Sequence, residues 1–460
     1  MRGLSARGRV FATAGGVAFL TAADNTVVAA AAPSIGGDLG LGLAATQAIT
    51  AAYLVPFAGL LLSAGAFVDR VGERRALRLG LFGFAAGTVL AALGARFGVG
   101  VLLGGRAAQG AAAALLVPAA LGVIRTRLSD HDRPKGAALW AVCLAAALAG
   151  GPALGGLTAE HLHWTWVFWG FLPIVALGVA VLPEPAPPPR PGRVGVLGGG
   201  LAAAAMALLT GGLLVLADGH AVAGPLVALG LAAAAAFAVR ERHAPILPRE
   251  LLASRTVRVT VVAQALWGLG VTGVSVVTPL VHQRWLGLGP AEAALPLAAV
   301  AGALILAAPF VPRLSRAHGQ AAVAAGGLAV VAAGLVAIAA VDHIPLLWPR
   351  MPGLVLIGIG SAATVPLTTL ALDAAGERAA GAVSGLLGAA REFAGALGVA
   401  LIALVVAAAD LVSGYTWALA AAAAGQLAAA ALVWTLCPLD KPSRNSAHQA
   451  DKSTAAQSTA

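Results

Sequence analysis

The sequence predicts an all-α integral membrane protein with fourteen transmembrane helices, and three observations lead to this fold class. Hydrophobic residues make up 59% of the 460-residue chain, charged residues only 10%, and the mean hydropathy is +0.89. Apolar segments of about twenty residues, the length that crosses a bilayer as a helix, recur along the chain. Arginine and lysine gather in alternate connecting segments. A soluble domain carries about a quarter charged residues, so the solvent around this chain is largely lipid.

Each transmembrane element is predicted from an apolar segment bounded by charged or Pro- and Gly-rich residues. The fourteen spans cover residues 10–33, 47–68, 77–95, 99–124, 136–157, 164–183, 194–216, 221–239, 257–281, 291–311, 320–341, 346–371, 381–409 and 414–436. The signal is weakest in the seventh and eighth spans, where alanine and glycine dominate. The first span resembles a signal peptide at its basic start, but its apolar run is too long for one and contains Asp24, so we expect it to be retained.

The positive charges predict the orientation of the chain. With the N-terminus in the cytoplasm, 24 of the 29 arginines and lysines fall on the cytoplasmic side. The outer side holds Arg96, Arg284 and Arg350, and two arginines lie inside spans. This positive-inside pattern favours an even number of spans with both termini cytoplasmic. The net charge of +10 is therefore a consequence of topology, and we expect no nucleic-acid partner.

Composition divides the chain into four parts. Residues 183–193 read Pro-Glu-Pro-Ala-Pro-Pro-Pro-Arg-Pro-Gly-Arg and predict a stiff connector. A second connector contains Pro245 and Pro248. The predicted organisation is a six-helix bundle, connectors with two inserted helices, a second six-helix bundle and a disordered cytoplasmic tail. These parts cover residues 1–183, 184–256, 257–437 and 438–460.

Four motifs in the first half carry a family resemblance. They are Asp24-Asn-Thr-Val-Val with Pro33, Gly-Ala-Phe-Val-Asp-Arg-Val-Gly-Glu-Arg-Arg at 65–75, Leu-Leu-Gly-Gly-Arg-Ala-Ala-Gln-Gly-Ala at 102–111, and Gly-Gly-Pro-Ala-Leu-Gly-Gly at 150–156. In this order they resemble the first-helix motif, the cytoplasmic loop signature, the span-4 motif and the antiporter motif of the fourteen-helix drug:proton antiporter family of the major facilitator superfamily. The resemblance implies two six-helix bundles that rock about a central cavity.

The chain departs from the family pattern at several positions. Ala29 and Phe171 stand where the family usually has asparagine, and Thr165 where it has arginine. The matching loop of the second half, Pro312-Arg-Leu-Ser-Arg-Ala-His-Gly, contains no acid. These departures affect the prediction of the substrate more than the prediction of the fold.

Ionisable residues inside spans are the candidates for proton coupling, since each costs about 3 kcal/mol in the bilayer centre. Asp24 lies near mid-depth, where a carboxylate deprived of water can bind and release a proton near neutral pH; the alternative is a neutral aspartic acid that ties helices together. Arg106 is predicted to be a fixed positive charge beside Asp24, as the resemblance also implies, or else a snorkelling side chain. Glu392, next to Arg391, is predicted to be a second proton site or a ligand for a cationic substrate, unless both lie toward the cytoplasm.

Two sets of residues are predicted to control conformation. The first is a cytoplasmic gate that pairs charges across the two halves in one state only, with a plain positive-inside loop as the alternative; it comprises Gly65, Asp69, Arg70, Gly72, Arg74 and Arg75. The second is the antiporter motif in the fifth span, where a proline bends the helix and glycines form a bare packing surface between the halves; it comprises Gly151, Pro152, Gly155 and Gly156.

Polar and aromatic residues near the spans are candidates for the substrate cavity, with buried interhelical hydrogen bonds as the alternative. The candidates are Asn25, Tyr53, Gln109, Trp267 and Arg391. We expect no metal and no cofactor, because the two cysteines, Cys143 and Cys437, lie in or beside apolar segments. None of the three lysines lies in a phosphate-binding loop, so transport is driven by an ion gradient or is passive.

The sequence thus predicts a monomeric secondary transporter, not an enzyme, that exports hydrophobic small molecules, cationic ones among them, in exchange for protons. Its composition, rich in alanine, glycine and arginine, indicates a GC-rich bacterium and hence drug or antibiotic efflux across the bacterial cell membrane. Two alternatives remain. One is an importer or uniporter on the same fold. The other is a membrane-embedded enzyme or a sensor, which the short loops and the lack of a cluster of acids and histidines disfavour.

Overall fold

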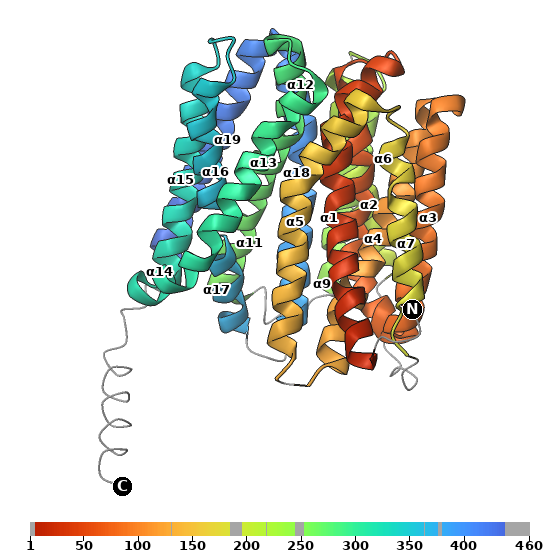
Figure 1. Cartoon of the computed structure of the whole chain (residues 1–460). Helices are drawn as coiled ribbons and strands as arrows, with labels where there is room; N and C mark the ends of the chain where they lie inside the picture. The colour runs from red at the N-terminus through yellow and green to blue at the C-terminus, as the bar shows by residue number, and fades with distance from the viewer. Residues whose placement is uncertain are drawn as a thin grey trace.

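The computed structural model describes residues 5–129, 131–184, 196–217, 219–243, 253–362, 364–375 and 380–437. Within these ranges every regular element is helical (Figure 1). Thirteen helical stretches are long and apolar enough to cross a bilayer, and a shorter apolar stretch at Trp166–Ala180 supplies the sixth position. The predicted all-α membrane fold is therefore confirmed. The Pro-rich connector, most of the second connector and the polar tail lie outside the described residues.

The first half of the chain consists of six spans joined by short turns. Its helices are α1 (Ala6–Asp38), α2 (Leu43–Val71), α3 (Glu73–Phe97), α4 (Val99–Arg127), α5 (Arg133–His161) and the pair α6 (Trp166–Trp169) and α7 (Phe171–Ala180). The sixth position is broken at Gly170, so it is shorter than the continuous span predicted there.

The inserted pair and the second half follow. The inserted helices are α8 (Val196–Ala217) and α9 (Ala223–His243). The second half contains α11 (Arg255–Trp267), the π-helix η1 (Gly268–Thr272), α12 (Gly273–Leu286), α13 (Pro290–Ala307), the 3-10 turn η2 (Ala308–Phe310), α14 (Val311–His318), α15 (Gln320–Val341), the 3-10 turn η3 (Trp348–Arg350), α16 (Met351–Ala362), α17 (Val365–Ala375), α18 (Ala380–Ala408) and α19 (Leu411–Leu436).

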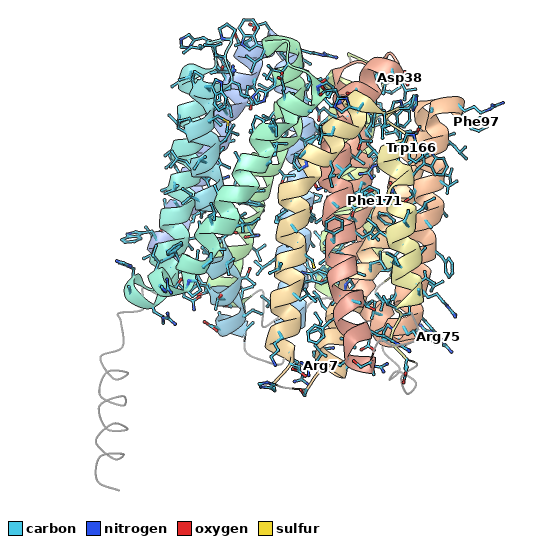
Figure 2. All side chains as sticks on the ribbon, viewed as in Figure 1. Arg7, Asp38, Arg75, Phe97, Trp166 and Phe171 are labelled. Atoms are coloured by element: carbon cyan, nitrogen blue, oxygen red, sulfur yellow. The ribbon has the colours of Figure 1, made fainter. Side chains whose placement is uncertain are left out.

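The two ends of the helix bundle differ in chemistry. Arg7 and Arg75 lie at the end that carries the N-terminus, whereas Asp38, Phe97 and Trp166 lie at the other end (Figure 2). We call the first end the basic face and the second the opposite face. The turns between α2 and α3 and between α14 and α15 both lie at the basic face (Figure 1).

These two turns have the same backbone geometry. Gly72 has φ 85° and ψ 147°, and Gly319 has φ 86° and ψ 154°. Positive φ at both positions favours glycine, because a Cβ is strained there. The turns join the second and third spans of each half, which is the signature of an internal repeat.

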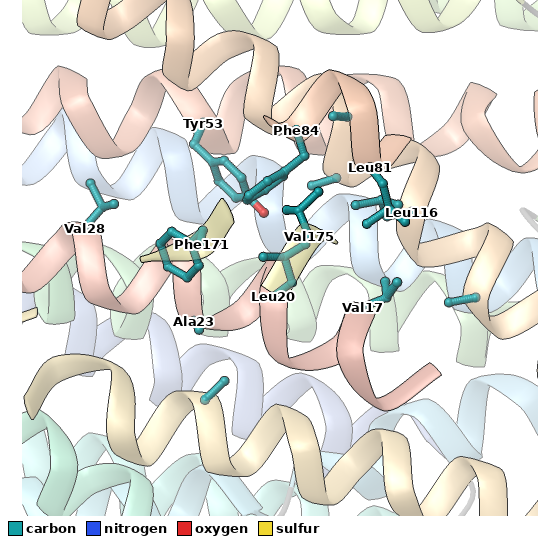
Figure 3. Packing of buried hydrophobic residues seen from close by; sticks show 14 of the residues in the cluster. Val17, Leu20, Ala23, Val28, Tyr53, Leu81, Phe84, Leu116, Phe171 and Val175 are labelled. Carbon is teal, nitrogen blue, oxygen red and sulfur yellow. The ribbon is translucent and has the colours of Figure 1, made fainter. Parts of the chain in front are cut away.

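Small residues let the helices of the first half approach closely. Side chains from α1, α2, α3, α4 and α7, among them Leu20, Tyr53, Phe84, Leu116 and Phe171, form one buried cluster (Figure 3). Between α3 and α4 the backbones nearly touch, since a Cβ on Gly105 would lie 2.7 Å from the Cα of Ala91. Such bare surfaces replace the hydrophobic driving force that helices lack in lipid.

The inserted helix α8 packs against both halves. A Cβ on Gly59 of α2 would overlap the Cα of Ala203, and Leu214 lies in a buried cluster with Ala51 of α2 and Ala403 of α18. On the other side of the molecule, α5 packs against α13. The insertion therefore covers one of the two lines along which the halves meet.

Replacing Gly105 by alanine tests the close approach of α3 and α4. We expect Gly105→Ala to lower the free energy of unfolding by about 1–3 kcal/mol, because the added methyl group meets backbone. Thermal unfolding of the detergent-purified protein measures the loss. Gly104→Ala is the matched control, since a Cβ there meets no atom within 4 Å. Equal melting temperatures for the two variants would contradict the packing.

Candidate functional site

An aspartate, an arginine and a glutamine form a buried polar cluster in the first half. Arg106 of α4 donates to Asp24 Oδ2 of α1 at 2.5 Å and to Gln109 Oε1 at 2.8 Å. Gln109 donates to Asp24 Oδ1 at 3.0 Å, so both carboxylate oxygens accept a hydrogen bond. All three side chains are 0% exposed. The two span residues predicted to interact are therefore in direct contact.

Four helices hold this cluster in place. Arg106 and Gln109 project from the same face of α4, three residues apart. Gln109 also donates to Thr88 of α3 at 2.9 Å, and Arg106 Nε donates to the carbonyl of Ile49 on α2 at 3.2 Å. The cluster thus joins α1, α2, α3 and α4.

Tyr53 covers one side of the arginine. Its ring centroid lies 4.7 Å from the guanidinium carbon of Arg106, in a cation–π contact. The Tyr53 hydroxyl donates to the carbonyl of Thr21 on α1 at 3.1 Å. Arg106 Nη2 is buried and has no hydrogen-bond partner among the described residues. The guanidinium therefore keeps one donor that can bind a further acceptor.

The second half contributes a charged pair that is partly accessible. Arg391 Nε and Nη2 donate to Glu392 Oε1 at 2.9 and 2.6 Å, and the two side chains are 39% and 13% exposed. The adjacent Phe393 packs against the core of the first half. Glu392 therefore lies on the part of α18 that meets the first half.

The antiporter motif packs mainly within its own half. A Cβ on Gly151 would overlap Thr26 Oγ1, and one on Gly155 would overlap the carbonyl oxygen of Val27. The sequence predicts that the motif as a whole lies between the halves, but these two glycines face α1. Residues 151 and 155 share one helix face because they are four apart. The buried Pro152 lies in the same turn of α5.

Gly156 is the motif residue that contacts the second half. A Cβ there would lie 2.7 Å from the Cα of Ala291, at the start of α13. One turn further along α5, Glu160 Oε2 accepts a hydrogen bond from the Ala291 backbone nitrogen at 3.0 Å. Helix α5 thus connects α1, next to Asp24, with α13 at the opposite face.

Among the described side chains, those of the predicted gate do not pair across the halves. Arg70, Arg74 and Arg75 form no ion pair within the described ranges. Glu73 instead pairs with Arg127 of α4 at 4.0 Å, inside the first half. Asp69 lies in the last turn of α2, and its side chain lies outside the described residues.

The halves meet toward the opposite face and separate toward the basic face. On the line between α2 and α18, a Cβ on Gly388 would lie 3.5 Å from Leu61. One turn closer to the basic face, a Cβ on Gly65 or Gly385 would meet no atom within 4 Å. Among the described residues, the contacts between the halves therefore lie toward the opposite face, and no charge pair across the halves is seen at the basic face.

The remaining cavity candidates have different environments. Asn25 lies one turn from Ala29, which packs against Val276 and Val399 of the second half, and its Oδ1 is buried without a partner among the described residues. Trp267 donates to Ser361 at 3.2 Å within the second half. Tyr53 and Gln109 are buried beside Arg106, so in this conformation they bind protein groups.

Sequence reasoning missed a second buried ion pair. Arg350 Nη2 donates to Asp342 Oδ1 at 2.8 Å, Thr416 donates to Asp342 Oδ2 at 3.0 Å, and both charged side chains are 0% exposed. The sequence places Arg350 on the outer side and does not predict that its side chain is buried there. The available signal was an acid and an arginine eight residues apart around Pro345.

The fold and this site together define a multi-pass membrane transporter built from two helical halves. The family comparison makes the assignment definite, because the model of the Major Facilitator Superfamily matches residues 14–399. The chain belongs to this superfamily, whose members are transporters.

Curated relatives include export and resistance proteins of Streptomyces and Amycolatopsis. The tetracenomycin C resistance and export protein of Streptomyces glaucescens is 30% identical over 422 residues, covering 87% of this chain and 77% of the relative. The puromycin resistance protein of Streptomyces alboniger is 30% identical over 91% of this chain and 88% of its own length. The cephamycin export protein of Amycolatopsis lactamdurans is 33% identical, with coverages of 84% and 82%.

Solved structures support the same fold. A D-xylose-proton symporter superposes with a TM-score of 0.70 at 14% identity, covering 95% of this chain and 99% of the symporter. A peptide transporter gives 0.69 at 17% identity, with coverages of 92% and 93%. At these identities the likeness shows the fold alone.

A mutant cycle tests whether Asp24 and Arg106 neutralise each other. We expect Asp24→Leu to lower the free energy of unfolding by about 3–5 kcal/mol, because it leaves the Arg106 charge buried and unpaired. The double variant Asp24→Leu/Arg106→Met is expected to be more stable than Asp24→Leu, since no uncompensated charge remains. Denaturation in increasing SDS measures each variant. If the loss of stability in the double variant equals the sum of the losses in Asp24→Leu and Arg106→Met, the two side chains do not interact directly.

Proposed function

We propose that this protein exports hydrophobic small molecules from a bacterial cell in exchange for protons. The observation that carries the proposal is the buried Asp24–Arg106 pair. The residues that follow Asp24 on α1 form the surface on which α5 packs. Gly151 and Gly155 contact Thr26 and Val27 there. A change in the charge of Asp24 therefore acts beside the helix that reaches the second half.

The proposed cycle begins with a proton on Asp24. Protonation removes the negative charge, whereas Arg106 stays positive at all relevant pH values. The guanidinium keeps its bonds to Gln109 and Ile49 but is no longer neutralised. Glu392, on the part of α18 that meets the first half, then attracts the guanidinium from the other half. This attraction favours closure at the basic face, and loss of the proton reverses it.

The charge distribution supports placing the basic face in the cytoplasm, in line with the positive-inside rule. In that orientation the end at which Gly65 and Gly385 meet no neighbouring atom faces the cytoplasm, and we expect a compound for export to enter there. Glu392 is then a second proton site within reach of the cytoplasm. The transporter works as a monomer, because each chain contains both halves and the whole Asp24 cluster.

The relatives support a substrate class. Three of them are named for export of, or resistance to, tetracenomycin C, puromycin and cephamycin. We therefore propose that the substrates are antibiotic-like compounds with large apolar surfaces. An importer or a uniporter remains the alternative on the same fold, and the direction of movement separates it from an exporter.

Replacing Asp24 by asparagine tests the coupling. Asparagine keeps the size of the side chain but cannot bind and release a proton, so Asp24→Asn is expected to reduce proton-driven uptake into energised everted vesicles at least tenfold. Puromycin and ethidium serve as probes. Asp38→Asn is the control, because that side chain lies at the end of α1 and is about half exposed. Unchanged uptake by Asp24→Asn would refute the scheme, and probe movement in the inward cellular direction would favour an importer.

Bulky residues in the antiporter motif test the role of α5. We expect Gly155→Leu and Gly156→Leu to reduce efflux at least tenfold with little change in the amount of protein in the membrane. The reason is that the first pushes α5 from α1 and the second pushes it from α13. Gly150→Leu is the matched control, since a Cβ there meets no atom within 4 Å. Full efflux by the two motif variants would show that this packing does not control transport.

A further inference from the structure

The short helix α14 at the basic face is cationic and amphipathic. Arg313, Arg316 and His318 are exposed, and neither arginine forms an ion pair within the part of the chain described. The equivalent turn of the first half contains Glu73, which accepts a hydrogen bond from Thr126. No acid occurs between residues 311 and 320. The proposed transport cycle uses none of these groups.

An apolar groove of about 1070 Å³ begins beside this helix. It lies between α13–α14 and α15, with α16 behind it, and it belongs wholly to the second half. Its walls include Leu306 and Trp434, which are 73% and 53% exposed. Glycines widen it, since a Cβ on Gly302 or Gly326 would meet no atom within 4 Å. None of its lining residues comes from the helices that hold Asp24.

The apolar groove lies among the spans, and the basic residues of α14 lie at its end at the basic face. The part lined by α13, α15 and α16 is apolar, and His318 lines its end at α14. Helix α14 lies at the level where the spans end at the basic face (Figure 1). A ligand that fits this order has an apolar chain lying among the helices and an anionic group at the membrane surface.

We propose that this groove binds one anionic phospholipid from the leaflet at the basic face. An acyl chain fills the space between α13 and α15, and the phosphate lies at Arg313, Arg316 and His318. Basic pockets between transmembrane helices at the cytoplasmic side are known to take anionic headgroups. A zwitterionic headgroup fits less well, because its ammonium group would be brought to two arginines that pair with no acid among the described residues.

Lipid binding to the whole purified protein tests this assignment. Native mass spectrometry of the detergent-solubilised transporter measures the affinity for phosphatidylglycerol and for phosphatidylcholine of the same acyl chains. We expect the wild-type protein to prefer phosphatidylglycerol. At about 1 kcal/mol for each arginine near the surface, Arg313→Gln/Arg316→Gln is expected to weaken phosphatidylglycerol binding by roughly tenfold or more and to weaken phosphatidylcholine binding less, because the choline ammonium already offsets its phosphate.

The apolar part of the site has its own test. We expect Gly302→Leu and Gly326→Leu to weaken binding of both lipids, because the new side chains occupy the space of the acyl chain without overlapping protein. Gly104→Leu on α4 and Arg78→Gln/Arg125→Gln are the matched controls; the latter two arginines are exposed in the first half.

The outcomes separate the site from general membrane affinity. Equal binding of the two lipids by the wild-type protein would overturn the preference for an anion. Equal losses in Arg313→Gln/Arg316→Gln and in Arg78→Gln/Arg125→Gln would overturn the site, because net charge alone would explain them. Unchanged binding in both groove variants would overturn the placement of the acyl chain. The measurement needs no transported compound, so it is independent of the proposed export.

Discussion

The burial of two opposite charges in the hydrocarbon layer is the constraint on which the first half depends. A lone charge at that depth costs several kcal/mol, so Asp24 and Arg106 require each other and a full set of hydrogen bonds. Gln109 supplies one of these bonds, and the carbonyl of Ile49 supplies another. Gly110 lets α4 approach the backbone of α2 at Tyr53, and Gly87 and Gly105 let α3 approach α4, which carries both Arg106 and Gln109. In this half, the packing of the helices therefore also provides the hydrogen bonds that the buried charges need.

The two halves place their buried charges at different depths. In the second half, Arg350 and Asp342 are paired near the opposite face, where they tie the turn after α15 to α19 through Thr416. The middle of that half carries the accessible pair of Arg391 and Glu392 instead. The first half thus holds a sealed charge pair and the second an accessible one. This asymmetry is what a charge change at a single site needs in order to act across the interface.

The two halves repeat the backbone conformation of one turn but surround it with different side chains. Gly72 and Gly319 form turns of nearly equal geometry at the basic face. In the first half, Glu73 joins the turn to α4, whereas in the second half the turn presents arginines that form no ion pair with a described residue, beside an apolar groove. The same glycine-dependent turn therefore occurs in both halves. Its charged neighbours contact protein in the first half and, in our proposal, a membrane lipid in the second.

The sequence by itself determined the fold class, the number of spans and the presence of Asp24 and Arg106 inside them. Hydropathy and charge act on each segment separately, so these properties can be predicted locally. Tertiary structure decided that Gln109 belongs to the ion pair, that Gly156 alone of the motif glycines reaches the other half, and that Arg350 is buried. The physical reason is that these helices are apolar on nearly all sides. Without a polar face, the pattern does not indicate which way a residue points, and packing decides its neighbours.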